Sequence, residues 1–369
     1  MSKFFTILYT FRNRDIYRVR LSLRSLQQQK DSNFMVVFVD YGSDPDYGIA
    51  VKKVVDDFDF VTYHYVAHPG LLWNKSKAIN YGIYKATTPY VFLADVDVIF
   101  HHSFSAVMQQ LATPVGFYLF TIGYLPKEIN TKEAQKLSFE QRKPTHTGDT
   151  FGIGLFPLEA LQRVEGLDTF FHFYGSEDAD LNARLQQAGY VLKYHKPLLI
   201  QHLWHPRYPA KRDTQLTVQP RLSNVQRINQ RHLQWHQEIK AILPCGKGIF
   251  GNCYVKEDQL ILEKPTKTYQ LFNISAHVIH FLEVVLPALQ GEVVHFVCKE
   301  DSYSHSLKYQ VKQFLGKHTQ PYLSMKQVND LVLQQIVFYY RNCNYSYAVS
   351  QDLKEICFTV DLSKQLSNV

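Results

Sequence analysis

The chain has 369 residues, 46% of them hydrophobic and 14% aromatic, and its 40 basic and 33 acidic residues give a net charge of +7. This apolar content excludes an intrinsically disordered chain, and the length suits one large domain plus a smaller one. No apolar run approaches the roughly 20 residues that cross a bilayer. The basic excess comes without an RNA- or DNA-binding signature, so nucleic acid is not expected as a partner.

Strand-like and helical patterns alternate along the first hundred residues. This alternation predicts an α/β fold with a parallel sheet, whose ligands bind beyond the carboxyl ends of the strands. Polar clusters at residues 12–14, 40–43 and 95–97 follow three of the expected strands, so we expect the functional site at this edge. The expected strands cover residues 4–10, 34–39, 61–66 and 90–94, and the expected helices 15–29, 47–58 and 75–85.

The rest of the chain is less regular. Residues 122–148 are polar and read as a loop or a weak helix over the site, and residues 207–240 are rich in Arg, Gln and His. Pro and three glycines between residues 244 and 251 indicate a boundary, so we predict domains at 1–243 and 244–369. The second domain, of unknown role, should be a smaller α/β or α+β unit with strand-like runs at 269–274, 293–298 and 335–340.

The cysteines and the start of the chain indicate the cellular compartment. The five cysteines are odd in number, widely spaced and without a metal-ligand cluster, which is typical of reduced thiols in a cytosolic protein. Met1-Ser2-Lys3-Phe4 runs straight into a strand pattern, so no signal peptide is expected. We therefore expect a cytoplasmic protein. The cysteines are Cys245, Cys253, Cys298, Cys343 and Cys357.

Asp95-Val96-Asp97 ends the apolar run at residues 90–94. Residues two apart in a strand share a face, so both carboxylates could hold a hard divalent cation that keeps positions open for phosphate oxygens. Such a cation would act as a Lewis acid on a departing diphosphate. The alternative is a pair of solvated aspartates before a helix that begins near Ser103.

Glu177 and Asp178 follow Gly175-Ser176 at the start of a predicted helix that stops at Gly189. One of these carboxylates could serve as a general base, an effect typically worth about 10²–10⁴ in rate. Stabilisation of the helix dipole is the structural alternative. A helix N-terminus lowers the pKa of a carboxylate, whereas burial against the aromatic residues at 171–174 would offset this.

Two further motifs carry candidate ligands. His202 follows the apolar run at 198–200 and could complete a metal shell, whereas His205 would share its face only in a helix, which Pro206 disfavours. Lysines at the start of the helix at 75–85 could contact phosphates, although an ordinary basic helix face explains them as well.

Taken in order, these segments resemble a known family. Residues 10–14, 39–43 and 95–97 are similar to family 2 glycosyltransferases, and Trp73-Asn74-Lys75-Ser76-Lys77 and Gly175-Ser176-Glu177-Asp178 resemble the β-1,4-galactosyltransferase group and its bacterial relatives, including chondroitin-type polymerases. The resemblance covers roughly residues 3–206. It implies the glycosyltransferase A-type fold, a Rossmann-like mixed sheet flanked by helices.

The resemblance also implies roles for individual residues. Asp40 would bind the uracil or ribose of a UDP-sugar donor, and Asp97 and His202 would bind Mn²⁺ (or Mg²⁺), with Asp95 on the ribose or the metal. Asp178 would be the base of an inverting displacement, with Glu177 holding the acceptor. The other implied donor-binding residues are Thr10, Arg12 and Arg14 at the nucleotide and Trp73 and Lys77 near the phosphates or sugar.

Three positions depart from the family patterns. Tyr41 stands where many family 2 members have a second aspartate, and Tyr174 stands where the galactosyltransferases have a tryptophan, which puts base recognition and the acceptor sugar in doubt. Thr150 falls where those enzymes carry a bulkier donor-gating tyrosine. The smaller side chain suggests that an N-acetylated donor such as UDP-GalNAc could fit.

The sequence thus predicts an inverting hexosyltransferase that uses a UDP-sugar and acts on a glycan or lipid-linked glycan in bacterial surface polysaccharide synthesis. The basic residues 207–240 suggest peripheral association with the inner face of the membrane. Three alternatives stay open: a retaining transferase of the same fold, a non-catalytic glycan- or nucleotide-binding module, and a nucleotidyltransferase.

Overall fold

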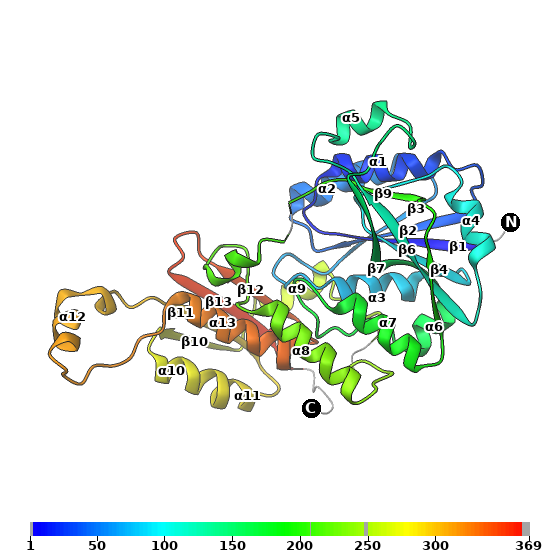
Figure 1. The fold of residues 1–369 in the computed structure, drawn as a ribbon. Helices are drawn as coiled ribbons and strands as arrows, with labels where there is room; N and C mark the ends of the chain where they lie inside the picture. Colours follow the sequence, from blue (N-terminus) through cyan, green and yellow to red (C-terminus); the bar gives the residue numbers. More distant parts are fainter. Residues whose placement is uncertain (1–2, 207, 247–249, 364–369) are drawn as a thin grey trace. The chain divides into compact units, whose positions relative to one another are not determined.

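The computed structural model describes residues 3–206, 208–246 and 250–363, which form two compact units (Figure 1). Unit 1 comprises residues 1–67, 73–208 and 228–253, and unit 2 comprises 68–72, 209–227 and 254–369. The expected domain boundary at 243–244 lies inside the last segment of unit 1. Met1 and Ser2, Arg207 of the basic segment, and residues 247–249 of the boundary region lie outside the described residues.

Unit 1 is built on one mixed sheet with the strand order β3-β2-β1-β4-β7-β6-β9-β5, and β8 pairs with β6. The neighbours from β3 to β4 are parallel, whereas β7 is antiparallel to both β4 and β6. The predicted fold class, a Rossmann-like mixed sheet flanked by helices, is confirmed. The strands are β1 (Phe5–Phe11), β2 (Phe34–Tyr41), β3 (Val61–Val66), β4 (Tyr90–Ala94), β5 (Val98–Phe100), β6 (Gly116–Tyr124), β7 (His146–Pro157), β8 (Val191–His195) and β9 (Ile200–His202).

The helices of unit 1 follow the predicted pattern closely over the first hundred residues. Further along, the polar stretch at 122–148 contains the end of β6, one short helix and the start of β7. The helices are α1 (Ile16–Gln27), α2 (Pro45–Val55), α3 (Lys75–Lys85), α4 (Phe104–Leu111), α5 (Thr131–Lys136), α6 (Leu158–Arg163), α7 (Glu177–Gln187) and, from residue 228 onward, α8 (Val225–Glu238).

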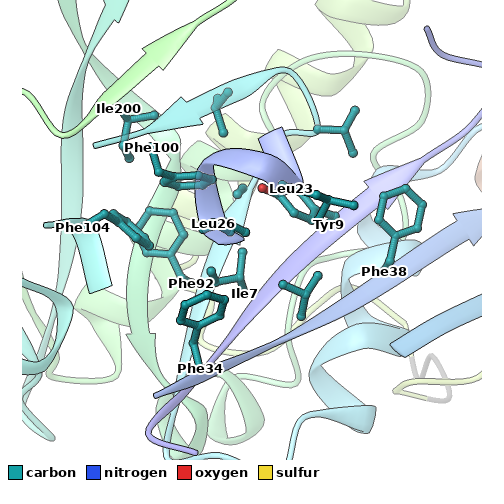
Figure 2. Packing of buried hydrophobic residues seen from close by; sticks show 14 of the residues in the cluster. Ile7, Tyr9, Leu23, Leu26, Phe34, Phe38, Phe92, Phe100, Phe104 and Ile200 are labelled. Atoms are coloured by element: carbon teal, nitrogen blue, oxygen red, sulfur yellow. The ribbon is translucent and has the colours of Figure 1, made fainter. Parts of the chain in front are cut away.

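Each face of the sheet in unit 1 has its own hydrophobic core. Alternate residues of β1 point to opposite faces, so Ile7 and Tyr9 pack with Leu23 of α1 and Phe104 of α4 on one side (Figure 2). Leu8 points to the other side, where the core is formed by residues of α3, α6 and α7. Close packing of the two apolar cores fixes the strands, and this fixes the positions from which the side chains at the strand ends extend.

Unit 2 contains a smaller four-stranded sheet in the order β10-β11-β13-β12, with only β10 and β11 parallel. This agrees with the predicted α/β or α+β character of the C-terminal region. The strands are β10 (Lys267–Phe272), β11 (Val293–Lys299), β12 (Tyr345–Val349) and β13 (Glu355–Asp361), and the helices are α9 (Lys256–Leu262), α10 (Ser275–His280), α11 (Leu286–Ala288), α12 (Leu307–Phe314) and α13 (Met325–Gln335).

One predicted strand in unit 2 is wrong. Residues Ile336–Tyr340 form a π-helical turn that continues α13, not a strand. Ile336, Val337 and Tyr340 are buried in it, a spacing that suits a helix. A short apolar run of β-branched and aromatic residues does not distinguish a strand from a buried helical segment by composition.

No helix in the described ranges is long and apolar enough to span a membrane.

The close approach of α3 to β1 depends on Gly82. A Cβ at this position would lie 2.6 Å from Leu8 Cγ in the middle of the core. We expect Gly82→Ala to lower the free energy of unfolding by about 1–3 kcal/mol, because the added methyl group overpacks this contact. Urea denaturation followed by circular dichroism would measure the change.

Gly48 in α2 is the matched control, because a Cβ there would make only ordinary contacts, the nearest at 3.5 Å from the Tyr65 ring. Gly48→Ala should be neutral or stabilising, since alanine has a higher helix propensity than glycine. Equal losses of stability in the two variants would contradict the assigned packing role of Gly82.

Candidate active site

The carboxyl ends of the parallel strands bring the predicted polar clusters together at one edge of the sheet in unit 1. Phe11 at the end of β1 is in register with Asp40 of β2, and Asp40 is in register with Tyr65 of β3. On the other side of β1, Tyr9 pairs with Ala94, the last residue of β4. Asp95-Val96-Asp97 follows as a turn between β4 and β5 and does not extend the strand.

The turn separates the two aspartates, and Asp97 faces a cluster of basic side chains. Its Oδ1 lies 3.4 Å from His202 Nε2, and its Oδ2 lies 3.4 Å from His205 Nε2 and 3.7 Å from Arg18 Nη1. Val98 of β5 pairs with His202 of β9, which brings that histidine beside Asp97. The three side chains Asp97, His202 and His205 form a group whose ligand atoms all lie within 4.8 Å of one another.

Two observations indicate that this group suits a cation. Asp97 Oδ1 is buried and accepts no hydrogen bond from any described residue. His205 Nδ1 lies 2.8 Å from the Pro206 carbonyl oxygen, which can only accept a hydrogen bond, so Nδ1 carries the proton. The Nε2 lone pair of a neutral His205 therefore faces the Asp97 carboxylate, and a proton or a metal ion is needed between them.

Asp95 pairs with Lys75, the first residue of α3. Lys75 Nζ is 3.4 Å from Asp95 Oδ1 and 3.7 Å from Asp178 Oδ2. Burial lowers the pKa of Lys75, but Asp178, Asp95 and Glu177 outweigh it and raise the pKa well above its usual value. Lys75 is thus a permanent positive charge that links the Asp95 turn to the start of α7.

The carboxylates at the start of α7 are shifted toward higher pKa values. Burial, together with the charge of Asp178, raises the pKa of Glu177 to about 7. Burial likewise raises the pKa of Asp178, and the Lys75 ammonium only partly offsets it. Burial therefore raises both pKa values, and a carboxylate of raised pKa is a stronger base once it is ionised.

Asp40 is completely buried at the end of β2. Tyr63 donates a hydrogen bond of 2.8 Å to its Oδ2, and the Ser43 backbone N–H donates one of 3.1 Å to its Oδ1. Burial raises the pKa of Asp40 despite these donors and the nearby charge of Arg12. Through its hydrogen bond from the Ser43 backbone, Asp40 fixes the turn that follows β2.

The sequence matches two known families over this part of the chain. Residues 6–158 match the family model described as Glycosyl transferase family 2, and residues 132–207 match the N-terminal domain of galactosyltransferase. The chain therefore contains a glycosyltransferase domain. This domain belongs to the transferase class of enzymes, as predicted. A search of curated protein sequences found no significant match.

Solved structures with a similar arrangement include two glycosyltransferases. One is the mannosyltransferase PcManGT from Pyrobaculum calidifontis in complex with GDP-Man and Mn²⁺, with 17% identity and a TM-score of 0.40 over 59% of this chain and 63% of that one. Another is GalNAc-T7 with UDP, GalNAc and Mn²⁺, with 11% identity and a TM-score of 0.42 over 55% of this chain and 44% of that one. The chain thus spans less than two thirds of either neighbour.

The remaining predicted residues of the glycosyltransferase domain lie at varied depths. The Trp73 ring packs edge-to-face on Tyr41 with 5.9 Å between centroids. Lys77 is only 8% exposed, and Lys75 of the same helix forms the ion pairs with Asp95 and Asp178. Thr10 and Arg12 are half-buried at the end of β1 and Arg14 is exposed just after it, whereas the Thr150 hydroxyl donates to backbone carbonyls of β6 and β7. Their roles stay predictions.

The sequence reasoning missed three residues of this edge. Arg18 on α1 was not singled out, and Lys75 was considered only with Lys77 as a possible phosphate contact, because nothing in their spacing distinguishes them from an exposed basic helix face. His205 was discounted because no helix was expected there. The structure has no helix at this point either, but the turn after β9 brings His205 to Asp97 as closely as His202.

The hydrogen bond from Tyr63 to Asp40 makes a pH-dependent prediction. Tyr63→Phe should lower the free energy of unfolding by about 1.5–3 kcal/mol at neutral pH, since it removes a donor from a buried carboxylate. Loss of the donor raises the folded-state pKa of Asp40 further above 3.8, its usual value. A raised carboxylate pKa costs stability as pH rises, so the loss should shrink in acid, where Asp40 is protonated.

Tyr65→Phe is the control, because the Tyr65 hydroxyl donates to the Ser43 carbonyl oxygen at 2.8 Å and not to a carboxylate. Its cost, about 0.5–1.5 kcal/mol, should change little with pH. Urea denaturation of both variants at neutral and acid pH measures this difference. The same pH dependence in both would rule out the assignment to Asp40.

Proposed function

We propose that the glycosyltransferase domain transfers a hexose or N-acetylhexosamine from a UDP-sugar to a glycan hydroxyl with inversion at the anomeric carbon. The observation that carries this proposal is the position of Lys75 between Asp95 and Asp178. It joins the turn with the candidate metal ligands to the candidate base within one site. The metal ligands could therefore bind the leaving diphosphate on one side of the donor sugar, while the base accepts the proton of the attacking hydroxyl on the other side.

Asp97, His202 and His205 would hold Mn²⁺ (or Mg²⁺). The oxygen and imidazole donors suit such an ion, and the unsatisfied Asp97 Oδ1 and the fixed His205 tautomer support it. When bound, the ion would supply Lewis-acid stabilisation of the diphosphate. His205 is thus the third ligand in this proposal. The sequence had suggested Asp95, which instead pairs with Lys75 and would face the ribose side.

The positive side chains of the site have a separate role. Arg18 donates 2.9 Å to the Trp204 carbonyl oxygen, which holds its guanidinium beside Asp97. Lys75 is held by its carboxylate partners. Both cations are positioned before the donor binds, so they could stabilise charge on the departing UDP without reorganising.

Asp178 would take the proton of the acceptor hydroxyl at its carboxylate as that oxygen attacks. Its raised pKa supports this role, because the proton must be held long enough for the bond to form. Glu177 beside it would orient the acceptor. The exposed Tyr174 ring stacks on Tyr208 with 4.9 Å between centroids and an interplanar angle of 8°, a flat surface for a sugar ring.

The biological setting is part of the same proposal. A glycan or lipid-linked glycan acceptor in bacterial surface polysaccharide synthesis suits a domain of this family. The chain's net charge of +7 would favour peripheral contact with an anionic inner membrane face from the cytoplasm. Because Thr150 is smaller than the tyrosine that the galactosyltransferases carry at this position, the proposed donor could be an N-acetylated sugar.

A donor panel tests the reaction. UDP release should be measured for UDP-Gal, UDP-GalNAc, UDP-Glc and UDP-GlcNAc, with GDP-mannose as a nucleotide control, in Mn²⁺ or EDTA. We expect one UDP-sugar to be hydrolysed or transferred only with the metal. Asp97→Asn and His205→Gln should each reduce kcat/KM by roughly 10²-fold or more, since each removes a metal ligand.

Asp149→Asn is the matched control, because this exposed carboxylate pairs with Lys196 and belongs to none of these groups. NMR of the product would assign its anomeric configuration, and a retained configuration would favour the retaining alternative. Full turnover in EDTA would contradict the proposed role of the metal ion. UDP binding without any turnover would favour a binding module.

Gly152 of β7 gives an independent test of Asp178. A Cβ at Gly152 would lie 2.5 Å from Asp178 Cγ and 2.8 Å from its Oδ1, so the carboxylate must move aside. We expect Gly152→Ala to lower kcat by roughly 10²-fold, the effect of a misplaced catalytic group. Its melting temperature should change little, because the displaced group is the end of a flexible side chain.

Gly148→Ala in the same strand is the control, since its Cβ would meet only the Tyr124 ring, at 3.3 Å. Steady-state kinetics of both variants would compare them. Normal turnover in Gly152→Ala would argue that the position of Asp178 is not critical for the reaction.

A further inference from the structure

A second group of metal-ligating side chains lies in the interior of unit 1, away from the strand-end turn. Asp168, His232 and His236 are all buried, and their ligand atoms lie within 4.8 Å of one another. The two histidines are four residues apart on α8, so they share one face of that helix. Asp168 comes from the loop between α6 and α7, which brings together segments distant in the sequence.

The ring nitrogens are oriented as metal ligands are. Asp168 Oδ2 lies 3.0 Å from His232 Nε2 and 3.5 Å from His236 Nε2. On the other side of its ring, His236 Nδ1 lies 2.6 Å from Asp180 Oδ1, so this nitrogen donates its proton to a carboxylate. A ligand histidine typically donates its second N–H to a carboxylate in this way, which leaves Nε2 for the metal.

The charges of the group also require a cation. Asp168 and Asp180 are both fully buried, and Arg184 pairs with Asp180 through a 2.7 Å bond from Nε to Oδ2. Among the described residues Asp168 has an ion pair only with the two histidines, so no lysine or arginine balances its charge. A buried carboxylate without a compensating positive charge is strongly unfavourable. Either a proton on the histidines or a metal ion must supply the balance.

Cys245 provides a fourth ligand type at the same place. Its backbone N–H donates 2.8 Å to Asp168 Oδ2, and its thiol lies within hydrogen-bonding range of the His236 imidazole. The thiol is not one of the ligand atoms that lie within 4.8 Å of one another, so it would have to turn toward the group to supply the fourth donor of a set typical of zinc. In the sequence alone, Cys245 is one of five widely spaced cysteines in the last third of the chain, and nothing there links it to the histidines.

We propose that Asp168, His232, His236 and Cys245 form a structural zinc site. Ligand atoms on a tetrahedral zinc lie about 3.3 Å apart, given bonds of about 2.0–2.1 Å to nitrogen and oxygen. The separations of 3.0 and 3.5 Å around Asp168 Oδ2 bracket that value. Zinc here would displace the proton between the carboxylate and the histidines and also the Cys245 thiol proton, both to solvent, and would bind the resulting thiolate.

This site has a different role from the proposed catalytic ion. Asp168, His232 and His236 are buried and Cys245 is half-buried. Together they would supply one sulfur, two nitrogens and one oxygen, so a bound zinc would have no open position for substrate. It would fasten α8 and the Cys245 loop to the loop that precedes α7. Its loss should therefore affect stability first, whereas the reaction itself does not pass through it.

Metal analysis of the full chain tests the site directly. The protein should be expressed without a polyhistidine tag, dialysed against a weak chelator and measured by mass spectrometry for metals. We expect about one zinc ion per chain. Cobalt added to the stripped protein should give the visible bands of a tetrahedral ion and the near-ultraviolet absorbance of a thiolate ligand. Zinc should restore the melting temperature lost on stripping, and Mn²⁺ should not.

Variants separate the ligands from their surroundings. Cys245→Ser should abolish the thiolate absorbance and weaken zinc binding at least tenfold, and His236→Gln should remove the ion. Cys253→Ser is the matched cysteine control, because its thiol donates to the Lys77 carbonyl oxygen and it should keep the zinc. Asp97→Asn should also keep it, which separates this site from the proposed catalytic ion whether or not the enzyme turns over.

Three results would overturn the zinc site. The first is wild-type protein that holds no zinc and shows no cobalt bands after metal addition, a measurement that does not depend on whether any variant folds. The second is an unchanged cobalt spectrum in Cys245→Ser. The third is loss of the zinc in Asp97→Asn, which would assign the ion to the strand-end turn.

Discussion

The pairing of Lys75 with Asp95 and Asp178 is the interaction on which the arrangement of the candidate active site depends. Carboxylates from the turn after β4 and from the start of α7 converge here, and like charges so close together repel unless a cation separates them. The Lys75 ammonium stands between two of them at 3.4 and 3.7 Å. A fixed charge at this position lets Asp95 stay ionised while the pKa of Asp178 is raised.

The direction of each pKa shift follows from distance to that ammonium and from burial. Burial raises the pKa of Asp95, but Lys75 and the nearby His202 and His205 outweigh it, so its pKa is lowered. For Asp178, burial wins over Lys75, and its pKa is raised. Asp95 and Asp178 contact the same lysine, yet the pKa of the first is lowered and that of the second is raised. Such a division suits a site in which one acid stays charged beside the donor and the other accepts a proton.

The sequence was most informative where local pattern decides structure. The alternation of apolar runs over the first hundred residues predicted β1 to β4 and α1 to α3 within a few residues, because the strands are buried and the helices amphipathic. It failed at residues 336–340, where composition alone favoured a strand. At the turn after β4 the strand rule for side-chain faces did not apply, so Asp95 and Asp97 acquired different partners.

Tertiary contacts explain what the sequence could not supply. The choice of Lys75 over Lys77 depends on how α3 is rotated against the sheet, and Gly82 helps to set that rotation by letting α3 approach Leu8. His205 reaches Asp97 through a turn, which no periodicity predicts. Asp168 lies 64 residues before His232 in the sequence, and only the packing of α8 brings the two histidines to it.

The group around Asp97 and the group around Asp168 both combine histidines with an aspartate. The ligand types do not distinguish a catalytic ion from a structural one, but burial does. In each, a histidine donates Nδ1–H to a fixed oxygen and turns Nε2 toward an aspartate. At Asp97 the side chains of Asp97 and His205 are 15% and 33% exposed, so a bound ion could exchange and meet a diphosphate. At Asp168 the corresponding fractions are 0% and 3%, so an ion there could only hold protein to protein. Solvent access, rather than ligand identity, is what makes the first suited to chemistry and the second to stability.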